Sequence, residues 1–278
     1  MMRILIVGLG LIGGSLAKAF KKFTDYDIVG FDKKEDVTKK AIEKGDIDQI
    51  FDGNYNGIDI IISGLFPRDT INFVKENEKK IAKNTIVTDC GGVKEKVCNE
   101  IEPIARENGF TFIGMHPMAG IEKFGYDNSF ADMFLGASLI LTPYSDTPYE
   151  QVKFLADTVS KAGFSRIKIT TPKKHDEVIA YTSQPAHVVS GAYIRSETAK
   201  SHVGFSAGSF RDMTRVAHLN ENMWTQLFMD NRENLARETD DLIDRLKEYS
   251  DALKSGDKEK LFEILKLGRE QKDFVDSL

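Results

Sequence analysis

Cysteine is scarce and long apolar runs are missing, and these two absences exclude several classes of protein. The 278 residues include only two cysteines, Cys90 and Cys98, too few for a disulfide-stabilised scaffold or a zinc ligand set. No apolar run approaches the roughly 18 residues of a membrane-spanning helix. The first apolar stretch, residues 4–7, leads directly into glycines, which is not the anatomy of a signal peptide. We therefore expect a soluble, reduced, cytoplasmic protein with no metal site and no membrane segment.

A surplus of basic charge is also missing. The chain has 38 Lys and Arg against 43 Asp and Glu, a formal net charge of −5, and its pI is about 5.7. Because a nucleic-acid surface needs a basic face, we expect no nucleic-acid partner. Hydrophobic residues make up 41% and charged residues 29%, as in ordinary globular proteins. At roughly 150 residues per domain, the length predicts one large domain or two ordinary ones.

The chain divides near residue 171. Before it, short apolar runs alternate with amphipathic segments, which predicts a doubly wound, mostly parallel α/β sheet. The predicted strands are residues 3–7, 27–31, 60–65, 85–89, 111–115, 138–142 and 166–170. Residues 94–108 and 150–162 predict helices, the first kinked or ended at Pro103. Residues 1–171 would form this α/β domain.

After Pro172 the strand-like runs stop, and residues 172–278 read as an all-helical domain. Residues 222–253 and 258–274 are long stretches of mixed charged and apolar character that predict helices. The intervening Ser255, Gly256 and Asp257 are typical of a turn, with Asp257 as the cap of the next helix. His175, which precedes Asp176, is expected to begin a helix rather than to act in catalysis.

A glycine-rich loop follows the first predicted strand and precedes a helix, as in the dinucleotide site of a Rossmann-type fold. Gly8 would permit a tight turn, Gly10 would let the backbone approach a pyrophosphate, and Gly13 would allow close packing of strand and helix. The alternative is a purely structural turn. The loop residues expected to bind cofactor are Gly8, Leu9, Gly10, Leu11, Ile12 and Gly13.

An acidic residue, Asp32, indicates which of the dinucleotides NAD and NADP the site would bind. Asp32 ends the second predicted strand and would accept hydrogen bonds from the adenosine ribose. Its charge repels a 2′-phosphate, so NAD is favoured over NADP, although the neighbouring Lys33 and Lys34 could accommodate NADP. Ser63 and Leu65, at the end of a later predicted strand, are also expected at the cofactor.

His116 is the best candidate for a general base. It follows the predicted strand at residues 111–115, and ligands of open α/β sheets bind beyond the carboxyl ends of the strands. An imidazole with a pKa near 6.5 suits proton removal at neutral pH, and Pro117 disfavours a helical conformation at His116. The alternative is a hydrogen-bonded structural histidine.

Residues 116–122, His-Pro-Met-Ala-Gly-Ile-Glu, resemble the signature of the prephenate and arogenate dehydrogenases of tyrosine biosynthesis. Further matches follow in the family's order, and the resemblance covers essentially the whole chain. They are residues 89–94, His175-Asp176, residues 183–187, residues 210–215 and Met223-Trp224. The resemblance implies a dinucleotide domain followed by a helical dimerisation domain, and therefore a homodimer.

The resemblance also implies a reaction, the oxidative decarboxylation of prephenate with NAD as oxidant. His116 would accept the proton of the ring hydroxyl while the carbon bearing it gives up hydride, and the ring carboxylate would leave as carbon dioxide. Arg215 matches the family's carboxylate-binding arginine, and His187 matches a histidine at the side-chain end of the substrate. Glu122 matches an acidic residue at the pocket mouth, and Lys94 would add positive charge.

Several of these roles have structural alternatives. Arg215 could be part of a surface ion pair, Lys94 a solvated residue in the first turn of a helix, and His187 a core histidine. Arogenate is the alternative substrate, and His187 in the family's prephenate-type position favours prephenate. A wider alternative is a β-hydroxyacid dehydrogenase, whose lysine-based chemistry the His116 motif fits poorly.

One position departs from the resembled pattern. Gly92 stands where the family usually has a serine whose hydroxyl contacts the catalytic histidine. Losing such a contact costs roughly 1–3 kcal/mol when its partner stays buried and unpaired. A water, or the hydroxyl of Thr182 or Ser183, could substitute. Gly92 keeps open the reading of a catalytically weak NAD-binding sensor.

The chain also leaves no room for two additional modules. A chorismate mutase module of roughly 90 residues, as some relatives carry, would not fit, nor would a separate regulatory domain after the helices. Any inhibition by tyrosine is therefore expected at the active site.

Overall fold

A six-stranded, all-parallel sheet forms the first half of the molecule in the computed structural model, which describes residues 2–278. The strand order is β3-β2-β1-β4-β5-β6, and every neighbouring pair is parallel. The strands are β1 (Arg3–Val7), β2 (Asp27–Phe31), β3 (Gln49–Ile50), β4 (Ile60–Ser63), β5 (Ile86–Asp89) and β6 (Thr111–Phe112). The order reverses between β1 and β4, where ligands of such sheets bind. The predicted Rossmann-type sheet is confirmed.

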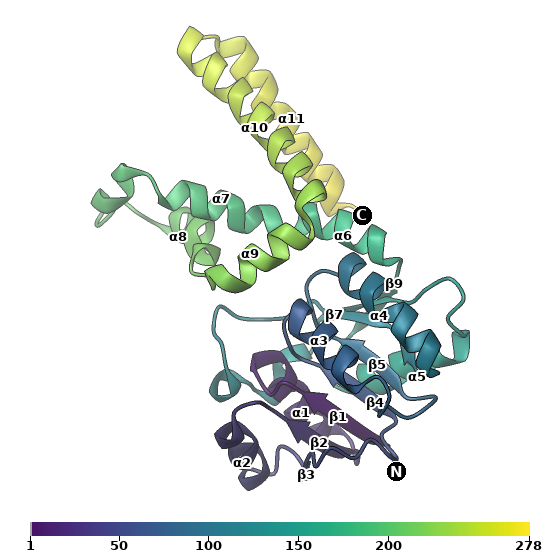
Figure 1. Cartoon of the computed structure of the whole chain (residues 1–278). Helices are drawn as coiled ribbons and strands as arrows, with labels where there is room; N and C mark the ends of the chain where they lie inside the picture. The colour runs from purple at the N-terminus through teal and green to yellow at the C-terminus, as the bar shows by residue number, and fades with distance from the viewer. Residues whose placement is uncertain (1) are drawn as a thin grey trace.

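Helices cover both faces of this sheet (Figure 1). Along β1, Ile4 and Ile6 pack in one core cluster and Leu5 and Val7 in the other, because successive strand side chains point to opposite faces. All four are fully buried, which explains the continuous apolar run. The helices are α1 (Leu11–Phe23), α2 (Glu35–Glu43), α3 (Pro67–Asn77) and α4 (Glu95–Asn108).

Helix α4 does not end early at Pro103. It continues to Asn108 and closes at Gly109, whose φ is 80°. Pro103 is exposed, so the carbonyl that loses its intrahelical partner lies toward solvent and can bond to water.

The predicted strand at residues 111–115 is in fact two strands in two sheets. Ile113 still donates its N–H to Val87 O at 3.0 Å, and the chain then leaves the first sheet. At Gly114 an added Cβ would lie 2.8 Å from Cys98 Sγ, so the backbone passes too close to α4 for a side chain. β7 (Gly114–Pro117) then begins a second sheet.

This second sheet has three strands in the order β7-β8-β9. β7 runs antiparallel to β8 (Ser138–Thr142), and β8 runs parallel to β9 (Arg166–Ile169). Helix α5 (Tyr149–Ser160) connects β8 to β9, and the turns η1 (Tyr126–Asn128) and η2 (Ala131–Phe134) lie between β7 and β8. The expectation that the last two predicted strands simply extend one sheet was therefore wrong.

The rest of the chain is helical, as predicted, and none of the helices among residues 2–278 combines the length and apolar character needed to cross a membrane. The elements are α6 (Pro172–Thr182), α7 (Gln184–Ile194), η3 (Glu197–Ser201), α8 (Gly208–Thr214), η4 (Arg215–Ala217), α9 (Glu221–Asp230), α10 (Arg232–Ser255) and α11 (Lys258–Asp276). Helices α10 and α11 form a hairpin that projects away from the sheets (Figure 1). Asp257 caps α11 by accepting the N–H of Lys260 at 2.9 Å, as predicted.

The single helix expected over residues 222–253 is broken at Asn231. This residue has φ −122° and ψ 27°, outside the helical region. Its buried side-chain amide donates to Asp176 O and to Gln184 Oε1, each at 2.9 Å. These contacts with α6 and α7 hold the break and set the direction of α10.

Candidate active site

The glycine-rich loop has the geometry of a phosphate-binding turn. Gly8 has φ +88°, and a Cβ on Gly13 would overlap the carbonyl oxygen of Gly8, so both positions require glycine. A Cβ on Gly10 would meet nothing within 4 Å, so the outer side of the turn is open. Helix α1 begins at Leu11 with neither a side-chain cap nor an acidic residue in its first turn. Its N-terminal N–H groups are therefore available to an anion.

The loop is held against the neighbouring strands. Asp32 Oδ2 accepts the N–H of Leu9 at 2.9 Å and Oδ1 accepts the N–H of Lys34 at 2.9 Å, which fixes the carboxylate beside the loop. Leu65 also reaches the loop, since its Cδ2 lies 2.7 Å from where a Gly8 Cβ would be. The buried hydroxyl of Ser63 instead lies 2.8 Å from that of Thr70 in α3. Of the other loop residues, Leu9 is buried, and Leu11 and Ile12 are half-buried.

His116 lies in β7 at the start of a chain of polar side chains. Its Nδ1 is 2.9 Å from Nε2 of His175, and Nδ1 of His175 is 2.6 Å from Oδ1 of Asp176. His175 and Asp176, both in α6, are 2% and 1% exposed, whereas His116 is half-buried. The hydrogen-bonded side chains thus lead from the half-buried imidazole of His116 to the buried carboxylate of Asp176.

The other nitrogen of His116 faces Gly92. A Cβ built on Gly92 would lie 3.7 Å from His116 Nε2 and 3.9 Å from Leu227 Cδ1. Burial, with smaller contributions from the charges of His175 and Lys94, lowers the pKa of His116 well below 6.5. The imidazole is therefore neutral at pH 7 and able to accept a proton. Thr182 donates its hydroxyl to Val178 O within its own helix, at 3.0 Å.

Lys94 is neither solvated nor exposed to a pocket. It is fully buried, forms an ion pair with Asp89, and donates from Nζ to Met115 O at 2.9 Å. Asp89 also accepts the N–H of Gly91 at 2.9 Å and that of Met115 at 3.3 Å. The pair therefore joins β5 to β7 directly before His116.

A second group of predicted residues lies among the C-terminal helices. Arg215 forms an ion pair with Glu122, which follows β7, and their side chains are 63% and 37% exposed. His187 lies in α7 with Nδ1 3.0 Å from Val216 O, and its ring centroid is 3.6 Å from that of Trp224. Burial lowers the pKa of His187 below 6.5.

Helix α9 connects the two groups. Trp224 stacks on His187, and Leu227 is the neighbour of Gly92 beside His116. Residues three apart lie next to each other on a helix face, so the two histidines flank one turn of α9. The structure thus brings His116, His187, Arg215 and Glu122 to one side of the domain junction.

Sequence reasoning missed the contact of His175 and Asp176 with His116. Their spacing from Ile179 and Ala180, at i+3 and i+4, places them on the apolar face of α6. An adjacent His and Asp on a buried face need partners, and this is the signal that could have identified them.

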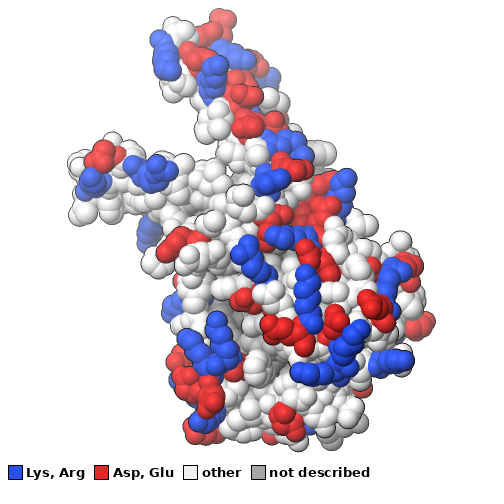
Figure 2. Space-filling view, viewed as in Figure 1, with Lys and Arg blue, Asp and Glu red and all other residues white. Residues whose placement is uncertain are grey.

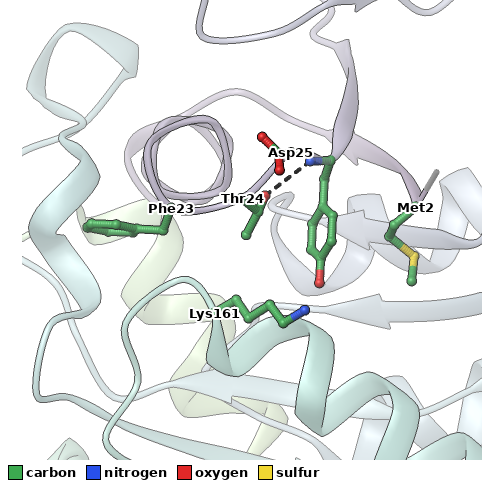
Figure 3. Close-up of a pocket in the computed structure, with 6 residues that line it drawn as sticks. Met2, Phe23, Thr24, Asp25 and Lys161 are labelled. Atoms are coloured by element: carbon green, nitrogen blue, oxygen red, sulfur yellow. Dashed lines mark hydrogen bonds between the residues drawn. The ribbon is translucent and has the colours of Figure 1, made fainter.

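A hollow of about 500 Å³ at the amino-terminal edge of the first sheet has a different character (Figure 3). It lies beside the starts of β1 and β2, opposite the glycine loop. Its lining residues are Met2, Phe23, Thr24, Asp25, Tyr26 and Lys161. It has no histidine and lies at the edge away from the carboxyl ends of the strands, so it does not compete as a catalytic site.

Comparisons with known proteins follow the two parts of the chain. Residues 16–168 match the family model described as prephenate dehydrogenase, nucleotide-binding domain. Residues 171–267 match the model described as prephenate dehydrogenase, dimerization domain.

Curated relatives cover nearly all of the chain. A prephenate dehydrogenase of Bacillus subtilis is 28% identical over 280 residues, which is 97% of this chain and 75% of the relative. A cyclohexadienyl dehydrogenase of Zymomonas mobilis is 32% identical over 275 residues, which is 95% of this chain and 92% of the relative.

Solved structures agree with the whole architecture. The prephenate dehydrogenase from Aquifex aeolicus in complex with hydroxyphenyl propionate and NAD+ superposes with a TM-score of 0.86 at 26% identity, over 99% of this chain and 98% of that one. A Synechocystis arogenate dehydrogenase superposes with a TM-score of 0.83 at 25% identity, over 99% and 100% of the two chains.

Proposed function

The chain belongs to the prephenate dehydrogenase family, and from this membership we propose that it oxidatively decarboxylates prephenate to 4-hydroxyphenylpyruvate in tyrosine biosynthesis, with NAD as oxidant. The observation that carries the proposal is the position of His116. Its neutral imidazole lies at the domain junction and turns Nε2 toward the space beside Gly92. An accessible imidazole backed by buried polar groups is the arrangement expected of a general base.

The residues around the glycine loop fit NAD. The open side of Gly10 and the uncapped N-terminus of α1 would hold the pyrophosphate, and the Asp32 carboxylate would hold the adenosine ribose and disfavour a 2′-phosphate. When bound, the nicotinamide accepts the hydride. Leu9, Leu11 and Ile12 would form the cofactor site as part of the loop, and Leu65 would pack against Gly8. Ser63 would support Leu65, because its hydroxyl accepts the Leu65 N–H at 3.4 Å and lies 2.8 Å from that of Thr70.

His116 supplies the proton transfer. Its Nε2 takes the proton of the substrate hydroxyl as the O–H bond breaks, and the carbon that bears the oxygen loses its hydrogen with both electrons. The bond to the ring carboxylate then breaks, its electrons enter the ring, and carbon dioxide leaves an aromatic product. Lys94 supports this step from within the protein by holding the strand of His116 through Asp89 and Met115.

Substrate carboxylates would bind at Arg215. Its guanidinium is exposed and is paired with Glu122, and a planar guanidinium suits a bidentate carboxylate contact. A bound carboxylate would replace Glu122 as the partner of Arg215, which places Glu122 at the pocket mouth. His187 would contact the side-chain end of the substrate.

Arogenate is the second candidate substrate, and the contacts of His187 favour considering it. The carbonyl of Val216 can only accept, so Nδ1 of His187 donates. With its pKa lowered by burial, the ring is neutral at pH 7 and Nε2 is an acceptor. An acceptor nitrogen suits the ammonium of arogenate, whereas the keto oxygen that prephenate has in its place would need a donor.

We also propose a homodimer formed through the helical region, with the domain boundary at residue 171. Residues of α7, of the segment that follows η3 and of the α10–α11 hairpin expose large apolar side chains, and α11 has no buried residue. In Figure 2 the lobe around α7 and α8 shows mostly uncharged atoms. Exposed apolar surface of this extent marks interfaces.

We propose that the protein is cytoplasmic. Both cysteines, Cys90 and Cys98, are free thiols, and thiols stay reduced in the cytoplasm.

The first experiment follows NADH absorbance with NAD and either prephenate or arogenate. Turnover of prephenate with release of carbon dioxide is expected, and His116→Asn should lower kcat by about 10²–10⁴-fold while NAD still binds. Turnover of arogenate alone would select the second candidate. If a protein that binds NAD produces no NADH with either substrate, the proposed enzymatic function is wrong and the alternative of an NAD-binding sensor is favoured.

A further inference from the structure

We propose that His175, anchored by Asp176, is a positioning residue that fixes the tautomer of His116 so that its Nε2 carries the lone pair facing the substrate. The inference rests on the proposed role of His116 as the base. It follows from which atoms in the buried chain can donate hydrogen bonds and which can only accept them.

Asp176 determines which atom donates in each hydrogen bond between these side chains, because its carboxylate can only accept. Oδ1 accepts the N–H of Lys94 and Oδ2 accepts the N–H of Glu95, both at 2.8 Å. These are backbone donors at the N-terminus of α4, where the helix dipole favours negative charge. Asp176 is 1% exposed. A proton on either oxygen would oppose a backbone N–H, so the remaining contact, with His175, must also be accepted.

The contact with Asp176 determines which nitrogen of His175 carries the hydrogen. Its Nδ1 lies 2.6 Å from Asp176 Oδ1 and therefore carries the hydrogen. A neutral imidazole has one N–H, and burial lowers the pKa of His175 below 6.5. The charged groups that face it, Lys94, Asp89 and Asp176, partly offset one another. Nε2 of His175 is consequently an acceptor.

His116 must then donate from Nδ1 across the 2.9 Å to His175 Nε2. The neutral ring has no second hydrogen, so Nε2, on the side of Gly92, has a free lone pair. The opposite tautomer would place a hydrogen there and could not remove a proton. When Nε2 receives the substrate proton, the resulting positive charge lies one imidazole away from the Asp176 carboxylate, which stabilises it, as in other base–orienter pairs.

The tautomer can be measured without turnover. Nitrogen-15 NMR of histidine-labelled protein, with and without NAD, distinguishes protonated from unprotonated ring nitrogens, and the five histidines can be assigned by single substitutions. We expect His116 to be protonated at Nδ1 and free at Nε2. A hydrogen on Nε2 would overturn the proposal whether or not the protein turns over prephenate.

Two substitutions of His175 test its contact with His116 and its contact with Asp176 separately. The amide of His175→Asn can take the place of Nδ1 and still reach Asp176, but it cannot reach His116. The amide of His175→Gln can reach His116, but it donates as readily as it accepts. Both variants should lower kcat by about 10–100-fold, with the substrate KM and the Kd of NAD unchanged within about twofold, and the Nε2–H form of His116 should appear.

Lys174→Gln is the matched control, because Lys174 precedes His175 in α6 but is exposed and pairs only with Glu177. It should leave kcat and the His116 tautomer unchanged. Full kcat in both His175 variants would overturn the proposal, as would a loss of kcat that merely follows a loss of NAD binding and thermal stability. If the variants fail to fold, the tautomer of the unsubstituted protein still decides.

Discussion

Gly92 stands where the sequence resemblance leads us to expect a serine, and the structure has space for a side chain there. A Cβ there would make ordinary contacts, at 3.7 Å from His116 Nε2 and 3.9 Å from Leu227 Cδ1. Its backbone is not among those with positive φ, so a side chain adds no strain. The space beside the base is therefore open to a hydroxyl.

Gly92→Ser should raise kcat/KM for prephenate by about 2–10-fold, the value of one added hydrogen bond near the reacting atoms. The assay is NADH production at a fixed pH near neutrality. Gly92→Ala fills the same space without a donor and should give no gain. An equal gain from alanine would show that packing, rather than the hydroxyl, is what the position lacks.

The pH dependence of the reaction follows from the buried setting of His116. A base works in its deprotonated form, so kcat/KM should rise with pH through the pKa of His116 and then stay flat. Because burial lowers that pKa well below 6.5, the rise should be centred below pH 6.5 and the rate should be level near pH 7. A profile of kcat/KM from about pH 5 to about pH 8 tests this. A midpoint above 6.5 would contradict the buried, neutral imidazole.

At the scale of the element, local patterns predicted what local contacts determine. The glycine loop and the strand before it depend on neighbouring residues, so both were recognisable. The splitting of residues 111–115 into β6 and β7 involves the pairing of Gly114 with Thr142 of β8, and the break at Asn231 involves Asp176 and Gln184. Contacts between residues so far apart in the sequence produce no hydrophobic periodicity, so the sequence pattern could not predict them.

The same reason explains what could be predicted of the candidate site. His116 was identifiable from its position after a strand, and Arg215, His187 and Glu122 from a resemblance. The partner of His116 is 59 residues away and the backbone donors to Asp176 are 82 and 81 residues away. The burial of Lys94 with Asp89 was likewise hidden, since a lysine at a helix start is usually solvated.

Asn231→Ala should destabilise the protein by about 1–3 kcal/mol, because it leaves the buried Gln184 Oε1 without its donor and removes the second hydrogen bond of Asp176 O. Urea unfolding followed by circular dichroism measures the change. Asn222→Ala, at an exposed position of α9, is the control and should cost far less. Equal costs would mean that the break between α9 and α10 does not depend on the Asn231 amide.

At the scale of the whole molecule, the helical region exposes several large apolar side chains, and the proposed dimer would cover them. Phe205 is 91% exposed, and Phe262 of α11 is 63% exposed. Phe154, on α5 in the α/β region, is 40% exposed and provides a comparison.

Sedimentation at micromolar concentration should give twice the 31.2 kDa mass of the chain. Phe205→Asp and Phe262→Asp should shift the protein toward monomer, because a charge in an apolar interface is costly, whereas Phe154→Asp should not. A monomeric unsubstituted protein would refute the dimer, and an equal shift by all three variants would point to general destabilisation.

The position of Asp176 also makes the setting of His116 depend on the contact between the two regions of the chain. The carboxylate belongs to α6 of the helical region, but its backbone donors belong to α4 of the α/β region, and His116 lies in β7. If the two regions moved apart, the histidine chain would be interrupted and His116 would be free to adopt either tautomer. The tautomer of His116 is thus coupled to the contact between the two regions of the chain.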